Sequence, residues 1–344
     1  MQEKIENNPQ SEIKKRQEDK LQREFGPVIL AALADPRTED VLLNPDSSLW
    51  IKRLAEPFER FGKLDPAQAL SALSTIAASR GTVLNHDKPI IETELLLDDS
   101  RFEGIVRPVV RNPVFAIRLR PKKIFTLAQY EEAGILSSHD DPLNKRAERE
   151  DFVASVRGRS HRDIIVAAIK AHKNILVVGS TGSGKTTFVN AMLDALATLC
   201  PDDRVVMIED TTELQCTVKN FVDLRAVGNV TMLDCLRAAM RLKPHRIVVG
   251  EVRGSEAHVL LKAWNTGHPG GAATIHADDA MGGLLRLEQL VAEATTAPQQ
   301  QLIAAAVNLV VFIGEEAAVP SRRKVKQLAF VSGYADGCYQ LEYL

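Results

Sequence analysis

Residues 174–193 read NILVVGSTGSGKTTFVNAML, a short apolar run followed by closely spaced glycines, a lysine, two threonines and a segment with helical spacing. Glycine at this density weakens an ordinary strand or helix, so it indicates a tight turn or a ligand that approaches the backbone closely. Residues 179–186 fit the pattern G-x-x-x-x-G-K-[ST] and stand between a buried strand and the start of a helix, as that pattern requires. The stretch therefore predicts a phosphate-binding loop in an α/β domain.

Each residue type in this loop has a task in phosphate binding. Glycines let backbone N–H groups curl around phosphate oxygens, and the following helix adds its positive N-terminal end. We expect Lys185 to reach the β- and γ-phosphates, the Thr186 hydroxyl to bind Mg²⁺ and Thr187 to lie near the α-phosphate. The predicted nucleotide-binding residues are Gly179, Ser180, Thr181, Gly182, Ser183, Gly184, Lys185, Thr186 and Thr187. The alternative is a glycine-rich turn without a ligand.

Acidic side chains follow two further apolar runs. RIVVGE ends in Glu251 and RVVMIE ends in Glu209, with Asp210 and Glu213 shortly after. Neighbouring strands of a parallel sheet open onto the same crevice as the phosphate loop, so Glu251 is the predicted residue that orients or deprotonates the attacking water. Glu209 is expected at the same rim, and a capping role at a strand or helix end stays open for each carboxylate.

Length and composition limit the function classes. A chain of 344 residues is long enough for two domains, and its 43 basic and 45 acidic residues leave a net charge of −2. Near-neutrality argues against a protein that coats nucleic acid. The polar, charged start is unlike a secretory signal, and no window is apolar enough to span a membrane, so we expect a cytoplasmic protein. The spacing of Cys200, Cys216, Cys235 and Cys338 indicates reduced, buried thiols rather than disulfides or a zinc site.

The pattern along the chain predicts four segments. Residues 1–24 form a charged leader that is disordered or loosely helical, 25–125 a mixed α+β domain, 126–158 a polar linker and 159–344 an α/β domain. In the last segment, apolar runs such as ILVV and AATIHA alternate with helical segments, which indicates a largely parallel sheet covered on both faces. The final twenty residues read as a hairpin.

Four motifs occur in a recognisable order: GSTGSGKTT, IEDTTEL, RLKPHRIVVGEVRGSEA and TGHPGGAATIHADDA. This series resembles the secretion ATPases of type II and type IV systems, in which the elements are named the Walker A loop, aspartate box, Walker B segment and histidine box. EDVLLNPDSSLWIKR and DDSRFEGIVRPVVRNPVFAIRLR resemble the N-terminal domain of the conjugative-transfer branch, the TrbB type. The resemblance covers about residues 25–320.

The resemblance implies a RecA-like P-loop ATPase domain with a smaller α+β N-terminal domain, assembled into a homo-hexameric ring at the cytoplasmic face of the inner membrane. It implies ATP and Mg²⁺ as cofactors and inner-membrane components of a secretion complex as partners. By position, Glu251 is the Walker B glutamate, and Glu209 belongs to the aspartate box and the Mg²⁺ shell. His276 is undecided on spacing alone, and the resemblance makes it a sensor of the γ-phosphate.

Four arginines complete the candidate site. The resemblance places Arg101 and Arg118, from the N-terminal domain, over the nucleotide, against the alternative of solvated strand charges. Arg246 and Arg253 flank the Walker B strand, where structural ion pairs and catalytic roles are equally open.

The leading functional hypothesis is a motor that hydrolyses ATP to power substrate transfer or pilus biogenesis in a conjugative type IV secretion system. A RecA-like DNA translocase or helicase is one alternative, although an aromatic content of 5% and the absence of a basic cluster disfavour it. A type IV pilus or type II secretion motor is another alternative. A nucleotide-gated docking protein without turnover is disfavoured by Glu251 at a strand end.

Overall fold

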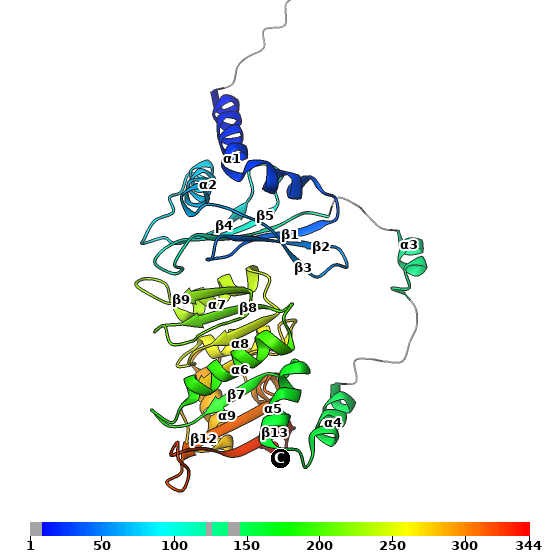
Figure 1. The fold of residues 1–344 in the computed structure, drawn as a ribbon, viewed down its shortest axis with the longest axis vertical. Helices are drawn as coiled ribbons and strands as arrows, with labels where there is room; N and C mark the ends of the chain where they lie inside the picture. Colours follow the sequence, from blue (N-terminus) through cyan, green and yellow to red (C-terminus); the bar gives the residue numbers. More distant parts are fainter. Residues whose placement is uncertain (1–8, 122–125, 137–144) are drawn as a thin grey trace, which may run out of the picture. The chain divides into compact units, whose positions relative to one another are not determined.

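The computed structural model describes residues 9–121, 126–136 and 145–344, with side chains from residue 12 in the first range and from residue 151 in the third. The chain divides into two compact units (Figure 1). The N-terminal unit holds the elements from α1 to β6, and the C-terminal unit holds those from α3 to β14. Each unit is described by itself.

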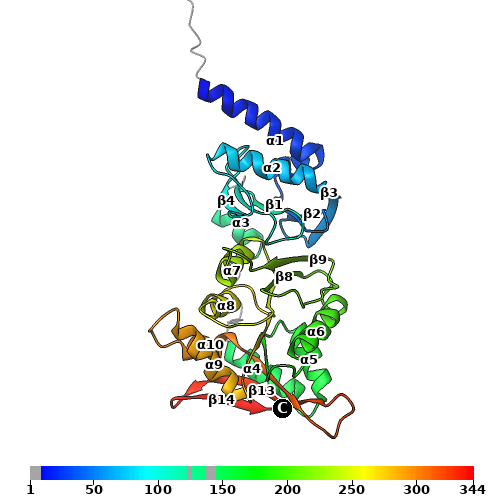
Figure 2. The ribbon, with the colours of Figure 1, turned by 90° about the vertical axis from the view of Figure 1, so that its left-hand side faces the viewer.

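The N-terminal unit is a six-stranded antiparallel sheet with two helices. The strand order is β3-β2-β1-β6-β5-β4, and α1 and α2 cover one face of the sheet (Figure 2). The elements are α1 (Pro9–Ala34), β1 (Thr38–Leu43), β2 (Ser48–Arg53), β3 (Phe58–Lys63), α2 (Pro66–Ser79), β4 (Ile90–Glu94), β5 (Arg101–Ile105) and β6 (Val114–Arg118). The predicted α+β character is confirmed. Strand β3 was not predicted, because its sequence FERFGK is polar and mostly exposed.

For residues 9–24 the helical alternative for the leader holds, whereas the expectation of a disordered tail is wrong. These residues are helical and belong to α1, and Leu21 and Phe25 are buried in the core of the N-terminal unit. The charged side chains lie on the outer face, where pairs such as Lys14–Glu18 follow the i,i+4 spacing of a helix. The apolar face was overlooked because so few apolar residues interrupt the charges. The first eight residues of the predicted leader lie outside the described residues.

The C-terminal unit is built on an eight-stranded sheet with the order β14-β13-β12-β7-β11-β10-β8-β9. The six strands from β12 to β9 run parallel, whereas β13 and β14 form an antiparallel hairpin at one edge, as predicted. The strands are β7 (Ile175–Val178), β8 (Arg204–Glu209), β9 (Asn220–Arg225), β10 (Arg246–Val249), β11 (Ala272–Ile275), β12 (Leu309–Glu315), β13 (Arg323–Ala335) and β14 (Cys338–Tyr343).

Helices cover both faces of this sheet (Figure 2). Helices α4, α5 and α6 pack on one face and share a core with β7, β8 and β12, while α7 to α10 lie on the other face. Their bounds are α3 (Leu127–Glu132), α4 (Lys145–Val156), α5 (His161–Lys170), α6 (Lys185–Leu199), α7 (Met232–Arg241), α8 (Glu256–Asn265), α9 (Ala280–Ala292) and α10 (Gln300–Ala306). Four central strands, β7, β8, β10 and β11, are buried along their whole length, as parallel strands covered on both faces must be.

The prediction of a linker over residues 126–158 is wrong for α4. Phe152, Val153 and Val156, on the last two turns of α4, are buried in the core of the C-terminal unit. The sequence NKRAERED that precedes them is charged, so composition alone indicated a linker. Residues 137–144, with Pro142, lie outside the described residues.

Candidate functional site

The phosphate loop connects β7 to α6 at the carboxyl edge of the parallel strands. Its first residue, Gly179, packs against β12: a Cβ atom there would stand 2.4 Å from the carbonyl oxygen of Ile313. Its last glycine, Gly184, caps α6 with a φ of 96°, a left-handed conformation that favours glycine. These two glycines are required by close packing and backbone conformation, so the loop shape is a property of the fold.

Lys185 lies in the first turn of α6 and its side chain folds back over the loop. The ammonium Nζ donates hydrogen bonds to the carbonyl oxygens of Gly179, at 2.8 Å, and Ser180, at 3.0 Å. It also lies 3.2 Å from Nδ1 of His276, which follows β11. Burial lowers the pKa of Lys185, and the negative charge of Glu251 opposes that shift. The lysine is thus held at the centre of the loop.

His276 connects Lys185 to Glu251. Its Nε2 lies 3.2 Å from Oε1 of Glu251, the residue that follows β10 after Gly250. Because a charged lysine only donates, the hydrogen bond with Lys185 requires Nδ1 as the acceptor, and Nε2 then carries the proton that faces Glu251. The phosphate loop and two neighbouring strand ends are therefore joined by one chain of hydrogen bonds.

Glu251 is also paired with Arg253. The guanidinium of Arg253 binds both carboxylate oxygens of Glu251, at 2.8 and 2.9 Å, and extends to Asp210 after β8. Burial would raise the pKa of Glu251, but the hydrogen bond from Arg253 and the positive charges of Arg253 and Lys185 lower it overall. Glu251 is therefore ionised at neutral pH, which an acceptor for a water proton requires.

Glu209 supports the loop that follows β8. Its Oε1 accepts backbone N–H groups of Glu213, at 3.0 Å, and Leu214, at 2.8 Å. Burial raises the pKa of this carboxyl group, while the two backbone hydrogen bonds oppose the shift. The close approach of Glu209 explains the glycine at position 250, where a Cβ atom would stand 3.0 Å from its Cγ. Glu209 thereby fixes the position of Glu213.

Glu213 meets the phosphate loop directly. Oγ1 of Thr186 donates a 3.0 Å hydrogen bond to Oε2 of Glu213, and Asn190 on α6 holds the same loop through the carbonyl oxygen of Glu213. A hydroxyl and a carboxylate are hard oxygen donors of the kind Mg²⁺ prefers. Thr186 and Glu213 therefore fit a Mg²⁺ site, and Glu209 stands behind them.

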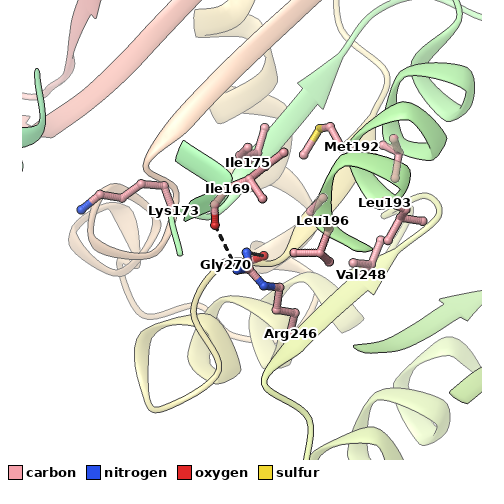
Figure 3. Close-up of a pocket in the computed structure, with 11 residues that line it drawn as sticks. Ile169, Lys173, Ile175, Met192, Leu193, Leu196, Arg246, Val248 and Gly270 are labelled. Atoms are coloured by element: carbon pink, nitrogen blue, oxygen red, sulfur yellow. Dashed lines mark hydrogen bonds between the residues drawn. The ribbon is translucent and has the colours of Figure 1, made fainter. Parts of the chain in front are cut away.

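Arg246 lies at the opposite, amino end of the strands. Its buried guanidinium pairs with Asp203 at 2.5 Å and donates to the carbonyl oxygens of Ile169, at 3.0 Å, and Gly270, at 3.1 Å. It borders a cavity of about 20 Å³, enough for one water molecule, that is otherwise lined mainly by apolar side chains from α5, α6 and the strands (Figure 3). This geometry favours the ion-pair role over the catalytic one for Arg246.

Arg101 and Arg118 stand side by side in the N-terminal unit. They are directly opposite each other in the register of β5 and β6, and both are exposed. Like charges in this arrangement repel, and in the described parts of the chain neither arginine forms an ion pair. Contact between this pair and the nucleotide stays a prediction.

Comparison with known proteins identifies the family. A family model described as "Type II/IV secretion system protein" matches residues 143–338, more than half of the chain. The chain belongs to this family. Members of the type II/IV secretion family similar to it include the conjugal transfer protein TrbB of Rhizobium radiobacter, which is 38% identical over 324 residues, covering 94% of this chain and 93% of the relative.

More distant members of the family share parts of the sequence or the fold. The type IV secretion system protein VirB11 of Bartonella quintana is 28% identical over 65% of this chain and 68% of the relative. A crystal structure of the VirB11 ATPase from the Brucella suis type IV secretion system, in complex with sulphate, superposes with a TM-score of 0.84. It is 23% identical and covers 93% of this chain and 96% of that chain. The two-domain α/β fold expected from the sequence is confirmed.

Within the C-terminal unit, the predicted residues of the type II/IV secretion family site lie together. The phosphate loop, Glu209, Glu251 and His276 all meet at one edge of the sheet, while their chemical roles stay predictions. Two contacts in the site were not predicted. Glu213 was placed at the rim without its hydrogen bond to Thr186, and Arg253 was left open between a structural and a catalytic role, without its ion pair to Glu251. A signal for Glu213 was available, since it lies four residues after Glu209 in the turn that closes the strand end. The expectation of buried thiols holds in full only for Cys235: Cys200 and Cys216 are partly buried, and Cys338 is exposed.

Proposed function

We propose that this protein is an ATP-hydrolysing motor that powers substrate transfer or pilus biogenesis in a conjugative type IV secretion system. The observation that carries the proposal is the chain Lys185–His276–Glu251, which links the phosphate loop to the ends of β11 and β10. Family membership and the 38% identity to a conjugal transfer protein support the biological setting.

The side chains divide the work of ATP hydrolysis. Backbone N–H groups of residues 179–187 and the start of α6 hold the phosphates, and Lys185 balances charge on the β- and γ-phosphates. Thr186 and Glu213 would hold Mg²⁺, with Glu209 behind them. The ion would supply positive charge at the transferred phosphoryl group. When the nucleotide binds, Glu251 releases Arg253, and its carboxylate then orients the attacking water.

His276 is well placed to report on the γ-phosphate. It accepts a hydrogen bond from Lys185 and lies next to Glu251. When a phosphate oxygen replaces Nδ1 of His276 as the acceptor of the hydrogen bond from Lys185, Nδ1 loses its donor, and the ring can turn toward the nucleotide. We propose that this movement of His276 changes its contact with Glu251, so that Glu251 responds to the presence of the γ-phosphate.

The assembly is a homo-hexameric ring of RecA-like domains at the cytoplasmic face of the inner membrane, docked on components of the secretion complex. Over the described residues, no helix has the length and apolar character needed to cross a bilayer. Arg101 and Arg118 are proposed to reach the nucleotide from the N-terminal domain. No observation favours a DNA translocase or a pilus motor over this assignment.

Steady-state ATP turnover by the purified full chain, with and without DNA and with and without inner-membrane components, tests the function. We expect magnesium-dependent turnover that the membrane components stimulate. Stimulation by DNA alone would favour a translocase, and nucleotide binding without turnover would favour a docking protein. Mass measurement in solution with ATP tests the hexamer.

A further inference from the structure

Arg323, the first residue of β13, lies against the phosphate loop although it is distant in the sequence. A Cβ atom built on Gly184 would stand 3.1 Å from Cδ and 3.2 Å from Nη1 of Arg323. Gly184 is the N-cap of α6, the helix that begins at Lys185. The side chain of Arg323 therefore lies beside the last glycine of the loop, at the start of α6.

This position is electrostatically unfavourable without an anion. The N-terminus of a helix carries a partial positive charge, and the ammonium of Lys185 is one residue away from Gly184. Among the residues that the structure describes, none forms an ion pair with Arg323. Glu315 stands directly opposite Arg323 in the register of β12 and β13, yet the two side chains are not paired. Arg323 is exposed and lies at the positive N-terminus of α6, although Glu315 is available as a partner. This position indicates that a negatively charged ligand binds there.

The hairpin holds Arg323 in place. Strand β12 pairs in parallel with β7, and Gly179 packs on Ile313 at the end of β12. The hydroxyl of Ser321 bonds to both the backbone N–H and the carbonyl oxygen of Arg323. Val325, two residues further along β13, packs against the core that includes α6. Residues two apart on a strand share a face, so the fold directs Arg323 toward the loop.

We infer that Arg323 binds the α- and β-phosphates of the bound nucleotide. Glu251 and His276 follow β10 and β11, which lie on one side of β7, whereas β12 and β13 lie on its other side. The γ-phosphate must face Glu251, so a cation from the β12 side meets the phosphates that remain after hydrolysis. The planar fork of arginine suits two phosphate oxygens. This inference rests on the proposed nucleotide-binding function.

Equilibrium binding of ADP and of a non-hydrolysable ATP analogue to the full chain tests the inference. Loss of a charge-assisted hydrogen bond costs about ten-fold or more in affinity, and we expect Arg323→Ala to weaken the binding of both ligands by similar factors. Arg323→Lys retains the charge without the fork and is expected to fall between Arg323→Ala and wild type. Lys324→Ala is the matched control, because it removes the same charge from the next residue, on the opposite face of β13.

Three outcomes overturn the inference: unchanged ADP affinity in Arg323→Ala, an equal loss in Lys324→Ala, or a loss confined to the ATP analogue. The variant Lys185→Ala distinguishes a failure of the Arg323 inference from a failure of the proposed nucleotide-binding function. If Lys185→Ala also binds both ligands normally, the phosphate loop itself is not the nucleotide site. Circular dichroism and thermal unfolding of each variant establish that the fold is retained.

Discussion

At the scale of single residues, Lys185 has two sets of partners available, its own loop carbonyls and the phosphates of a nucleotide. Because its ammonium stabilises negative charge rather than packing a core, we expect Lys185→Ala to fold and to lose roughly a hundred-fold or more in ATP turnover. A steady-state phosphate-release assay measures this loss. Turnover within a few-fold of wild type would end the assignment of the phosphate loop.

Two glutamates at this edge make different contacts and predict different phenotypes. Glu251→Gln retains shape but not the charge that orients water, so we expect nucleotide binding to persist while turnover falls by about a hundred-fold. Glu209→Gln retains an oxygen for the N–H groups of Glu213 and Leu214, so a smaller and magnesium-dependent loss is expected. Turnover and nucleotide affinity are measured for both across a magnesium series. A dead Glu209→Gln beside a nearly normal Glu251→Gln would reverse the two roles.

At the scale of elements, the amino ends of β8 and β10 are held by an ion pair. Burial tends to raise the pKa of Asp203, but His172 and Arg246 outweigh it and hold the pKa at about 2. A carboxyl group whose pKa is lowered by folding contributes stability that is present above its unfolded value near 3.8 and lost as the pH falls through its folded value. From these two values we expect about 2 kcal/mol of unfolding free energy to disappear between about pH 4 and pH 2.

Asp203→Asn tests this contribution by urea unfolding across that pH range. At neutral pH it leaves Arg246 buried without its carboxylate, so a loss of about 3 kcal/mol is expected. The difference from wild type should narrow as the pH approaches 2, since wild-type Asp203 is then protonated too. Asp202→Asn is the control, because its exposed side chain is the next residue in the same turn. A difference that stays constant with pH would mean that Asp203 does not titrate with folding.

Strand ends were predictable from the sequence, whereas contacts made by long side chains were not. Buried parallel strands appear as continuous apolar runs, and their carboxyl ends must converge, so Glu209, Glu251 and His276 could be placed at one edge in advance. Arg253 and Arg323 could not, because a flexible side chain can point to several partners until the tertiary structure selects one. Helix α4 and residues 9–24 were missed for a related reason: a few apolar residues among many charges are enough once a packed surface lies beside them.

At the scale of the whole molecule, an arginine pair from one domain is proposed to respond to a nucleotide in the other. Such a contact converts nucleotide state into domain position. We expect Arg101→Ala combined with Arg118→Ala to weaken ATP affinity and to reduce nucleotide-dependent compaction, measured by small-angle scattering. The separate C-terminal domain is expected to bind nucleotide through its phosphate loop. Unchanged compaction and affinity in the double variant would leave the N-terminal domain with a docking role only.

The position of β7 in the sheet has a consequence for biosynthesis. Its neighbours are β11 and β12, which lie roughly one hundred or more residues later in the chain. As a polypeptide emerges from the ribosome, β7 therefore lacks its native partner on one edge until β11 has been made, and on the other edge until β12 has been made. A nascent or prematurely terminated chain that ends before β12 carries the phosphate-loop sequence but lacks Ile313, against which Gly179 packs. The cell thus obtains a competent nucleotide site only from chains that have been translated at least through β12.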